Sequence, residues 1–236
     1  MHYEGIAREP SGTRVAYLEE HYVRRKDDRV TDRLVVYTCA DGRPFARKQL
    51  NYERSPLVPE LKMNDARAGM NIVLSGASGR RELTVSTRDD PEPRHHTVPG
   101  DPDVVADAGF NELLLQRWDP LIRGEDVSFR IVLLGSGAVH RLKAEHVEHV
   151  TVGGEERDHF RVALGGLLGL IAPSIDVWYS TRGHVLRRYE GISNLRDERG
   201  HQLRVVIDFP VAPPAAATEA DWQHAMERPL DTSCGS

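Results

Sequence analysis

The sequence lacks the features that would place it in a membrane or mark it for export. Its longest apolar run, from Leu164 to Ile175, contains three glycines and a proline and is too short to span a bilayer. Strand-like sequence begins directly after Met1, with no signal peptide before it. We therefore expect either a cytoplasmic protein or the mature form of an envelope protein whose export signal has been removed.

Cysteine is scarce, and the charge is not strongly of one sign. Cys39 and Cys234 are too few for a disulfide framework. Cys39 lies in an apolar, strand-like run, which favours a buried thiol, whereas Cys234 lies near the chain end; a disulfide between them is the less favoured alternative. The net charge of -5 argues against nucleic-acid binding, which requires a basic face.

Histidine is abundant, with eleven residues, but no spacing is typical of a metal site. His95 and His96 lie in a segment rich in proline and charge, which is a poor scaffold for a rigid site. His140 and His146 are about 20 Å apart if they lie on one strand. His146 and Glu148 supply only two ligands, and a zinc site needs three or four. We expect no metal and no cofactor.

No catalytic signature is present either. The stretch Ser75–Gly79 lacks the Gly-x-Ser-x-Gly pattern and the strand-to-helix context of an exposed nucleophilic serine. Gly165, Gly166 and Gly169 lack the lysine and hydroxyl residue of a phosphate-binding loop. Because carboxylates and histidines on different strands can converge in space, a hydrolase or isomerase stays an alternative. No catalytic residue is assigned.

What the sequence does contain is a succession of β-hairpins. From Val177 to Ile192 large apolar residues are spaced by two on either side of the turn Thr181–Gly183, and Asp41-Gly42 is a second strong hairpin signal. About a dozen strands are predicted, and an open sheet of that size must curl, split or close. The predicted fold is mainly β, a strongly curved antiparallel sheet or partial β-barrel. Strands are expected at 3–8, 13–25, 32–40, 43–53, 61–65, 70–87, 126–134, 139–150, 158–164, 174–181, 184–191 and 201–209.

One amphipathic helix is predicted over 107–119, with Asp107 as its N-cap and Pro120 ending it. Its apolar stripe is expected to lie on the concave face of the sheet. The proline-rich segment 89–103 is expected to be a mobile loop. The chain is thus expected to form one β domain over 1–210, followed by a flexible C-terminal tail over 211–236.

The pattern Tyr179–Asn194, followed by Asp197–Gly200 and Val205–Phe209, resembles the closing hairpins of uncharacterised exported bacterial proteins. Those proteins are similar to the LolA/LolB lipoprotein-carrier superfamily, in which a curved antiparallel sheet lidded by helices holds acyl chains. The resemblance implies a periplasmic or envelope-associated protein that faces lipid.

The leading hypothesis is a non-enzymatic binding protein for a hydrophobic, lipid-like ligand. The apolar segment 164–175 is expected to plug one end of the sheet as core; the alternative is an apolar gate beside a cavity. Besides the enzyme, a further alternative is an envelope-assembly module that binds another protein through a sheet edge, although no protein partner is indicated. The candidate ligand-binding residues are Phe110, Leu113, Leu114, Trp118, Leu167, Leu168, Leu170, Ile171 and Trp178.

Overall fold

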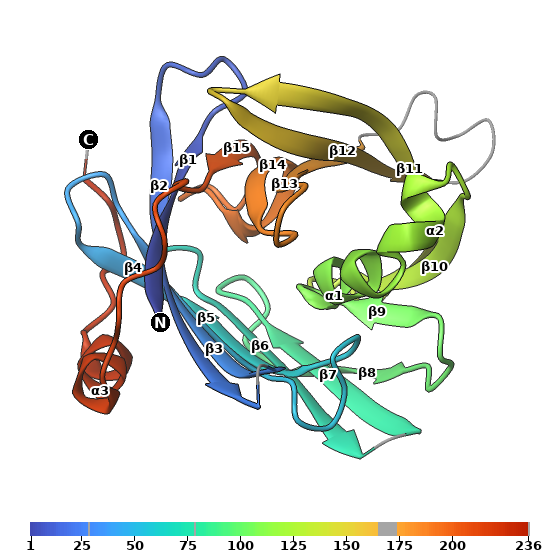
Figure 1. Ribbon diagram of the computed structural model, residues 1–236. Helices are drawn as coiled ribbons and strands as arrows, with labels where there is room; N and C mark the ends of the chain where they lie inside the picture. The colour runs from blue at the N-terminus through green and yellow to red at the C-terminus, as the bar shows by residue number, and fades with distance from the viewer. Residues whose placement is uncertain (28, 78, 165–173, 236) are drawn as a thin grey trace.

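The computed structural model describes residues 1–27, 29–77, 79–164 and 174–235, and in these ranges it contains one sheet of 15 strands bent around two helices (Figure 1). The strands are β1 (His2–Arg8), β2 (Val15–Lys26), β3 (Arg29–Thr38), β4 (Pro44–Asn51), β5 (Glu60–Asp65), β6 (Met70–Ala77), β7 (Arg80–Ser86), β8 (Arg94–Val98), β9 (Val104–Ala106), β10 (Val127–Val132), β11 (Val139–Val152), β12 (Glu155–Leu164), β13 (Ile175–Ser180), β14 (Leu186–Arg196) and β15 (Gln202–Asp208). The helices are α1 (Gly109–Gln116), α2 (Trp118–Ile122) and α3 (Glu219–Glu227).

The strand order is two meanders joined at the chain ends. From β8 back to β1 each strand pairs with its sequence neighbour, β1 then pairs with β15, and the second meander continues down to β9. All pairs are antiparallel except β9–β10. The edge strands β8 and β9 are consecutive in sequence, and the sheet is curved but not closed.

The prediction of a mainly β fold with a curved antiparallel sheet is confirmed, but the strand count is higher than the expected dozen. Two of the additional strands, β8 and β9, begin in or just after the segment 89–103 that was expected to be a mobile loop. β8 pairs with β7 from Arg81 opposite Val98 to Val85 opposite Arg94. This pairing satisfies the backbone hydrogen-bonding groups of β8 despite the polar composition of the strand. Tertiary pairing therefore overrides the local loop signal.

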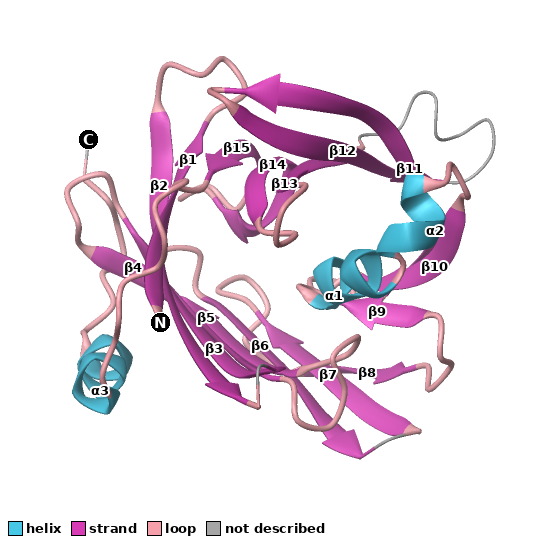
Figure 2. Ribbon diagram, viewed as in Figure 1, coloured by secondary structure: helices cyan, strands magenta, loops and turns pink. Residues whose placement is uncertain are grey.

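The predicted amphipathic helix is present inside the curve of the sheet, but it is broken into α1 and α2 (Figure 2). Asp107 is not the N-cap: α1 is preceded by Ala108 without a side-chain cap, and Asp107 instead accepts hydrogen bonds from Lys48. Pro120 does follow the end of α1, and it lies in the first turn of α2, where its missing N–H is not needed. At Gly109 a Cβ would overlap the Leu57 carbonyl oxygen, so only glycine allows this close approach.

The C-terminal segment, expected to be a flexible tail, has defined contacts on the convex face. Trp222 and Ala225 of α3 cover Leu34 and Val36 of β3. The Arg24 guanidinium lies 3.9 Å from the centroid of the Trp222 ring. α3 therefore packs on the outside of the sheet, away from α1 and α2 (Figure 1). No helix in the described ranges is both long and apolar enough to cross a membrane.

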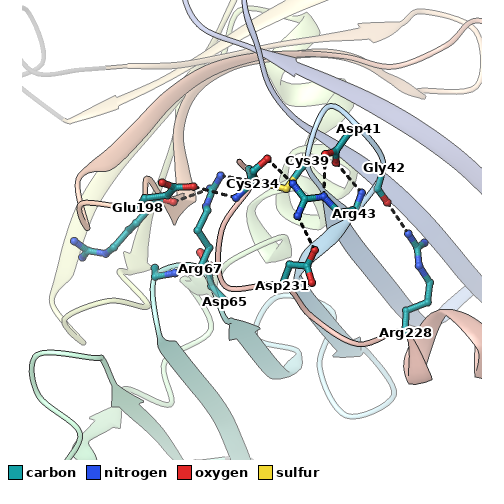
Figure 3. The surroundings of a disulfide bond; sticks show 12 residues. Cys39, Asp41, Gly42, Arg43, Asp65, Arg67, Glu198, Arg228, Asp231 and Cys234 are labelled. Atoms are coloured by element: carbon teal, nitrogen blue, oxygen red, sulfur yellow. Dashed lines mark hydrogen bonds and ion pairs between the residues drawn. A yellow bond between two sulfur atoms is a disulfide. The ribbon is translucent and has the colours of Figure 1, made fainter. Parts of the chain in front are cut away.

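A disulfide joins this segment to the sheet. Cys39, which directly follows β3, is bonded to Cys234 across a sequence separation of 195 residues, with the Cα atoms 5.4 Å apart (Figure 3). Arg43 supports the junction by donating to the Cys234 carbonyl oxygen at 2.7 Å and to Asp231 at 3.1 Å. The favoured interpretation of Cys39 as a free buried thiol is therefore wrong, because sequence alone does not reveal that the chain end returns to this strand.

Candidate functional site

The curved sheet and α1 border a half-open cavity of about 1950 Å³. Its lining comes from strands in both meanders and from one face of α1, so segments distant in sequence share one hollow interior. The strands that contribute lining residues are β1 to β4 and β10 to β15.

One part of the lining, here called the apolar wall, is formed by large aliphatic and aromatic side chains. They come from α1 and from strands of the second meander. Phe110 lies 6.4 Å from Tyr189, measured between ring centroids. This wall offers an environment in which a hydrocarbon group is removed from water. Its residues are Phe110, Leu115, Ile131, Leu142 and Leu186.

The candidate residues predicted from the sequence are distributed over three environments. Phe110 lines the cavity, whereas Leu113 and Leu114 are buried in the core between the helices and the sheet. Trp118 belongs to the same core; its ring stacks on His184 with centroids 3.8 Å apart and meets Phe160 edge-on at 4.9 Å. These three core residues support the wall without forming its surface. Leu167, Leu168, Leu170 and Ile171 lie outside the described residues.

Trp178 lies on the convex face of the sheet. Its neighbours Val177 and Tyr179 point into the core, so the two-residue period of the strand turns Trp178 outward. There it stacks on His159 with ring centroids 4.1 Å apart. His159 Nε2 is also 2.7 Å from Asp176 Oδ1. Trp178 therefore stabilises the outer surface and does not contribute to the cavity.

A second part of the lining, the polar wall, is formed by β2, β3, β4 and the turn before α1. It was not anticipated as a site. On β2, Glu19 and His21 are each only 6% exposed, and His21 Nε2 lies 2.7 Å from Glu19 Oε2. The ring of Tyr3 stacks on His21 with centroids 4.6 Å apart. The polar wall comprises Tyr17, Glu19, His21, Arg33, Lys48, Tyr52 and Asp107.

Further contacts order the polar wall. Lys48 Nζ donates to both carboxylate oxygens of Asp107 at 3.0 Å, and Asn194 donates to the same carboxylate. Tyr17 and Ser193 are joined by a hydrogen bond of 3.0 Å. These contacts link the first meander to β14 across the cavity, and they give the wall a rigid arrangement of donors and acceptors.

The sequence carried a signal for the polar wall. Tyr17, Glu19, His21 and Val23 alternate on one face of β2, mixing charge with apolar and aromatic residues. Neither face of the strand is cleanly apolar. The structure explains the mixture: the face with Glu19 and His21 lines the cavity, and α3 covers part of the opposite face of the adjacent β3. The two faces thus meet different partners.

The arrangement can bind a polar or charged group, and it includes a histidine–carboxylate pair of the kind used in general-base catalysis. However, no described serine, threonine or cysteine lies within hydrogen-bond distance of the His21 ring. In the described ranges no group of three histidine, cysteine, aspartate or glutamate residues could hold a metal ion.

The burial of His21 has a testable consequence for pH. Burial lowers the pKa of His21 below its ordinary value of 6.5; the hydrogen bond to Glu19 opposes this effect, and the charges of Arg33 and Lys48 reinforce it. As the pH falls, His21 therefore binds a proton in the unfolded chain before it does so in the folded protein. The stability that neutral His21 contributes is fully present above pH 6.5 and is lost as the pH falls below that value. We expect the free energy of unfolding, measured with urea, to decline less between about pH 7 and pH 5 in His21→Gln than in the wild type.

The His140→Gln variant, at an exposed position of β11 outside the Glu19–His21 pair, is measured beside His21→Gln to show any general effect of replacing a histidine. An unchanged slope in His21→Gln would show that His21 is not the group that responds to acid in this range.

Comparison with known proteins finds similarity among solved structures. No family model and no curated protein matches the chain. Among solved structures it is similar to a β-barrel-like protein of the domain of unknown function DUF1849 from Brucella abortus, with 9% identity and a TM-score of 0.45. The match covers 89% of this chain and 99% of that chain. The similarity concerns β-barrel-like architecture and assigns no activity.

Proposed function

We propose that the protein is a non-enzymatic binding protein whose lipid-like ligand occupies the interior cavity. The observation that supports this is the cavity of about 1950 Å³ with its apolar wall. Each methylene buried there contributes about 0.8 kcal/mol, so a chain of ten would contribute roughly 8 kcal/mol before the entropic costs of binding.

The Cys39–Cys234 disulfide supports a location in the bacterial envelope as part of this proposal. Disulfides persist in oxidising compartments such as the periplasm and are rare in the cytoplasm, where thiols are kept reduced. A cytoplasmic location is the alternative. Alkylation of the protein in freshly lysed source cells, without prior reduction, would leave both cysteines unmodified if the envelope location is right.

Binding is tested by displacement of a fluorescent fatty acid and by native mass spectrometry of gently purified protein. We expect displaceable binding in the wild type and at least about fivefold weaker binding in Leu115→Asp, because a buried charge in the apolar wall disfavours hydrocarbon. Val152→Asp is the matched control, since Val152 is 45% exposed and does not line the cavity. A clean apo mass together with no binding of the fluorescent probe would refute the proposal.

A second candidate is a hydrolase or isomerase, and the Glu19–His21 pair in the cavity lining is the observation that favours it. Conversion of a bound ester or ketone that disappears in His21→Gln would favour this enzyme over a carrier. The third alternative, an envelope-assembly module, would be favoured by a filled interior, and the cavity gives it no support.

A further inference from the structure

Arg33 is placed on the inner face of β3, in a row of apolar side chains. Its partners across the sheet are Val23 on β2 and Leu50 on β4, which are 7% and 3% exposed. Leu34, the next residue, faces outward beneath α3. The Arg33 side chain is partly buried and lines the cavity. The residues paired with Arg33 on both neighbouring strands are therefore buried and apolar.

Within the described residues, no side chain or backbone carbonyl accepts a hydrogen bond from Arg33, and its buried Nε has no partner. The other charges on the polar wall are paired, Glu19 with His21 and Lys48 with Asp107. A guanidinium carries five N–H donors, and a buried donor left without an acceptor costs free energy. Among the charged groups of the polar wall, Arg33 is therefore the one without a charged partner, although the Nδ1 atom of His21 is also buried without a hydrogen-bond partner among the described residues.

At neutral pH, the nearby described groups do not supply the missing hydrogen-bond acceptor for the Arg33 guanidinium. The charged form of Arg33 is opposed by burial and favoured by the ionised forms of Tyr3 and Tyr52, and by Glu112 and Asp107, which together raise its pKa above the ordinary value. Burial raises the pKa of Tyr52 to about 12, so this phenol is neutral at pH 7. The Asp107 carboxylate already accepts from Lys48 and Asn194. Neither the Asp107 carboxylate, which is paired with Lys48, nor the Glu112 carboxylate lies within ion-pair distance of Arg33.

Tyr52 adds a second unfilled position beside Arg33. Its hydroxyl group is buried and has no hydrogen-bond partner among the described residues. The Tyr52 backbone N–H donates to the Thr31 carbonyl oxygen at 2.8 Å, and this bond holds the end of β4 against β3 two residues from Arg33. Two buried donors without acceptors thus occur in adjacent parts of one wall.

Building on the proposed function, we propose that the ligand is an anionic amphiphile whose carboxylate or phosphodiester group binds the Arg33 guanidinium while its hydrocarbon chain lies along the apolar wall. The planar fork of a guanidinium matches the paired oxygens of these groups. Asp107 and Glu112 line the same cavity, and their charge disfavours a group with two negative charges. A singly charged head group is therefore the class that fits.

The test compares palmitic acid with hexadecanol, which has the same chain length and no charge, in displacement of a neutral fluorescent lipid. In wild type the acid should bind about tenfold more tightly than the alcohol, as expected for a charge-assisted hydrogen bond. Arg33→Gln should bring the two affinities within about twofold by weakening the acid alone, and Arg33→Lys should retain part of the preference. Arg29→Gln is the matched control, because exposed Arg29 also lines the cavity.

The outcomes separate this inference from the proposed function. Equal affinity of wild type for acid and alcohol would overturn the anionic class and leave lipid binding intact. Failure of both to bind would refute the proposed function itself. Displacement by acetate or inorganic phosphate as effective as that by palmitate would support anion recognition by Arg33 and overturn the lipid source. Thermal unfolding of each variant identifies loss of fold, and Arg33→Lys keeps the test decisive if Arg33→Gln is unstable.

Discussion

Loss of the Cys39–Cys234 disulfide is expected to lower the free energy of unfolding by about 5 kcal/mol. The bond closes a loop with a sequence separation of 195 residues, so it removes much conformational freedom from the unfolded chain. In the folded state it holds the segment after α3 on the end of β3, where Cys39 is 2% exposed. The expected decrease is comparable to the whole stability of many domains.

The measurement is urea unfolding of wild type and of the double variant Cys39→Ala/Cys234→Ala, each with and without dithiothreitol. Reductant should lower the wild-type transition midpoint and leave the double variant unchanged. It should also make the chain beyond Pro210 more sensitive to limited proteolysis, because α3 is then held by non-covalent contacts only, such as those with Leu34 and Val36 and the ion pair between Arg228 and Glu20. Equal midpoints for oxidised wild type and the double variant would contradict this account.

Trp118→Ala is expected to lower the free energy of unfolding by about 4 kcal/mol. The indole is 7% exposed and fills the space between α2 and the sheet, where it contacts His184, Phe160 and Tyr179. Its removal leaves a cavity that these aromatic rings can collapse into only partly. Because Trp118 supports the apolar wall from behind, ligand affinity should fall less than stability.

Trp178→Ala is the control for this substitution. The same residue type on the convex face should cost about 1 kcal/mol, since Trp178 is partly exposed and its main contact is the stacked His159 ring. Urea unfolding and fatty-acid displacement on both variants give the comparison. Loss of binding by Trp118→Ala with stability unchanged would instead place Trp118 on the ligand-contacting surface.

Local patterns in the sequence were sufficient for most of the elements. Two-residue apolar periods separated by turn residues predicted the hairpins, including all six strands expected after the helix, because period and turn chemistry are properties of neighbouring residues. The stripe from Phe110 to Trp118 predicted a helix for the same reason. The break at Arg117 was not predicted. The role of Asp107 was also missed, because its carboxylate accepts a hydrogen bond from Lys48, which lies 59 residues earlier in the chain.

The candidate site was less accessible from the sequence. Phe110 lines the cavity, whereas Leu113, Leu114 and Trp118 face the core on neighbouring sides of the same helical segment. A helical stripe about as wide as a third of the circumference contains both orientations, so the apolar pattern does not separate core from lining. The polar wall was missed because its members come from separate strands and show their relation only after the sheet curves.

The amino-acid sequence by itself determined that this chain alternates strands and turns and carries an apolar helix, because these depend on residues a few positions apart. The tertiary structure was needed to show that β1 pairs with β15, that Cys39 meets Cys234, and that Arg33 lines the interior with no hydrogen-bond partner for its Nε atom among the described residues. Each of these results from curvature and contacts between segments distant in sequence. Such contacts are chosen by the burial and pairing of the whole sheet, which no short stretch of sequence encodes.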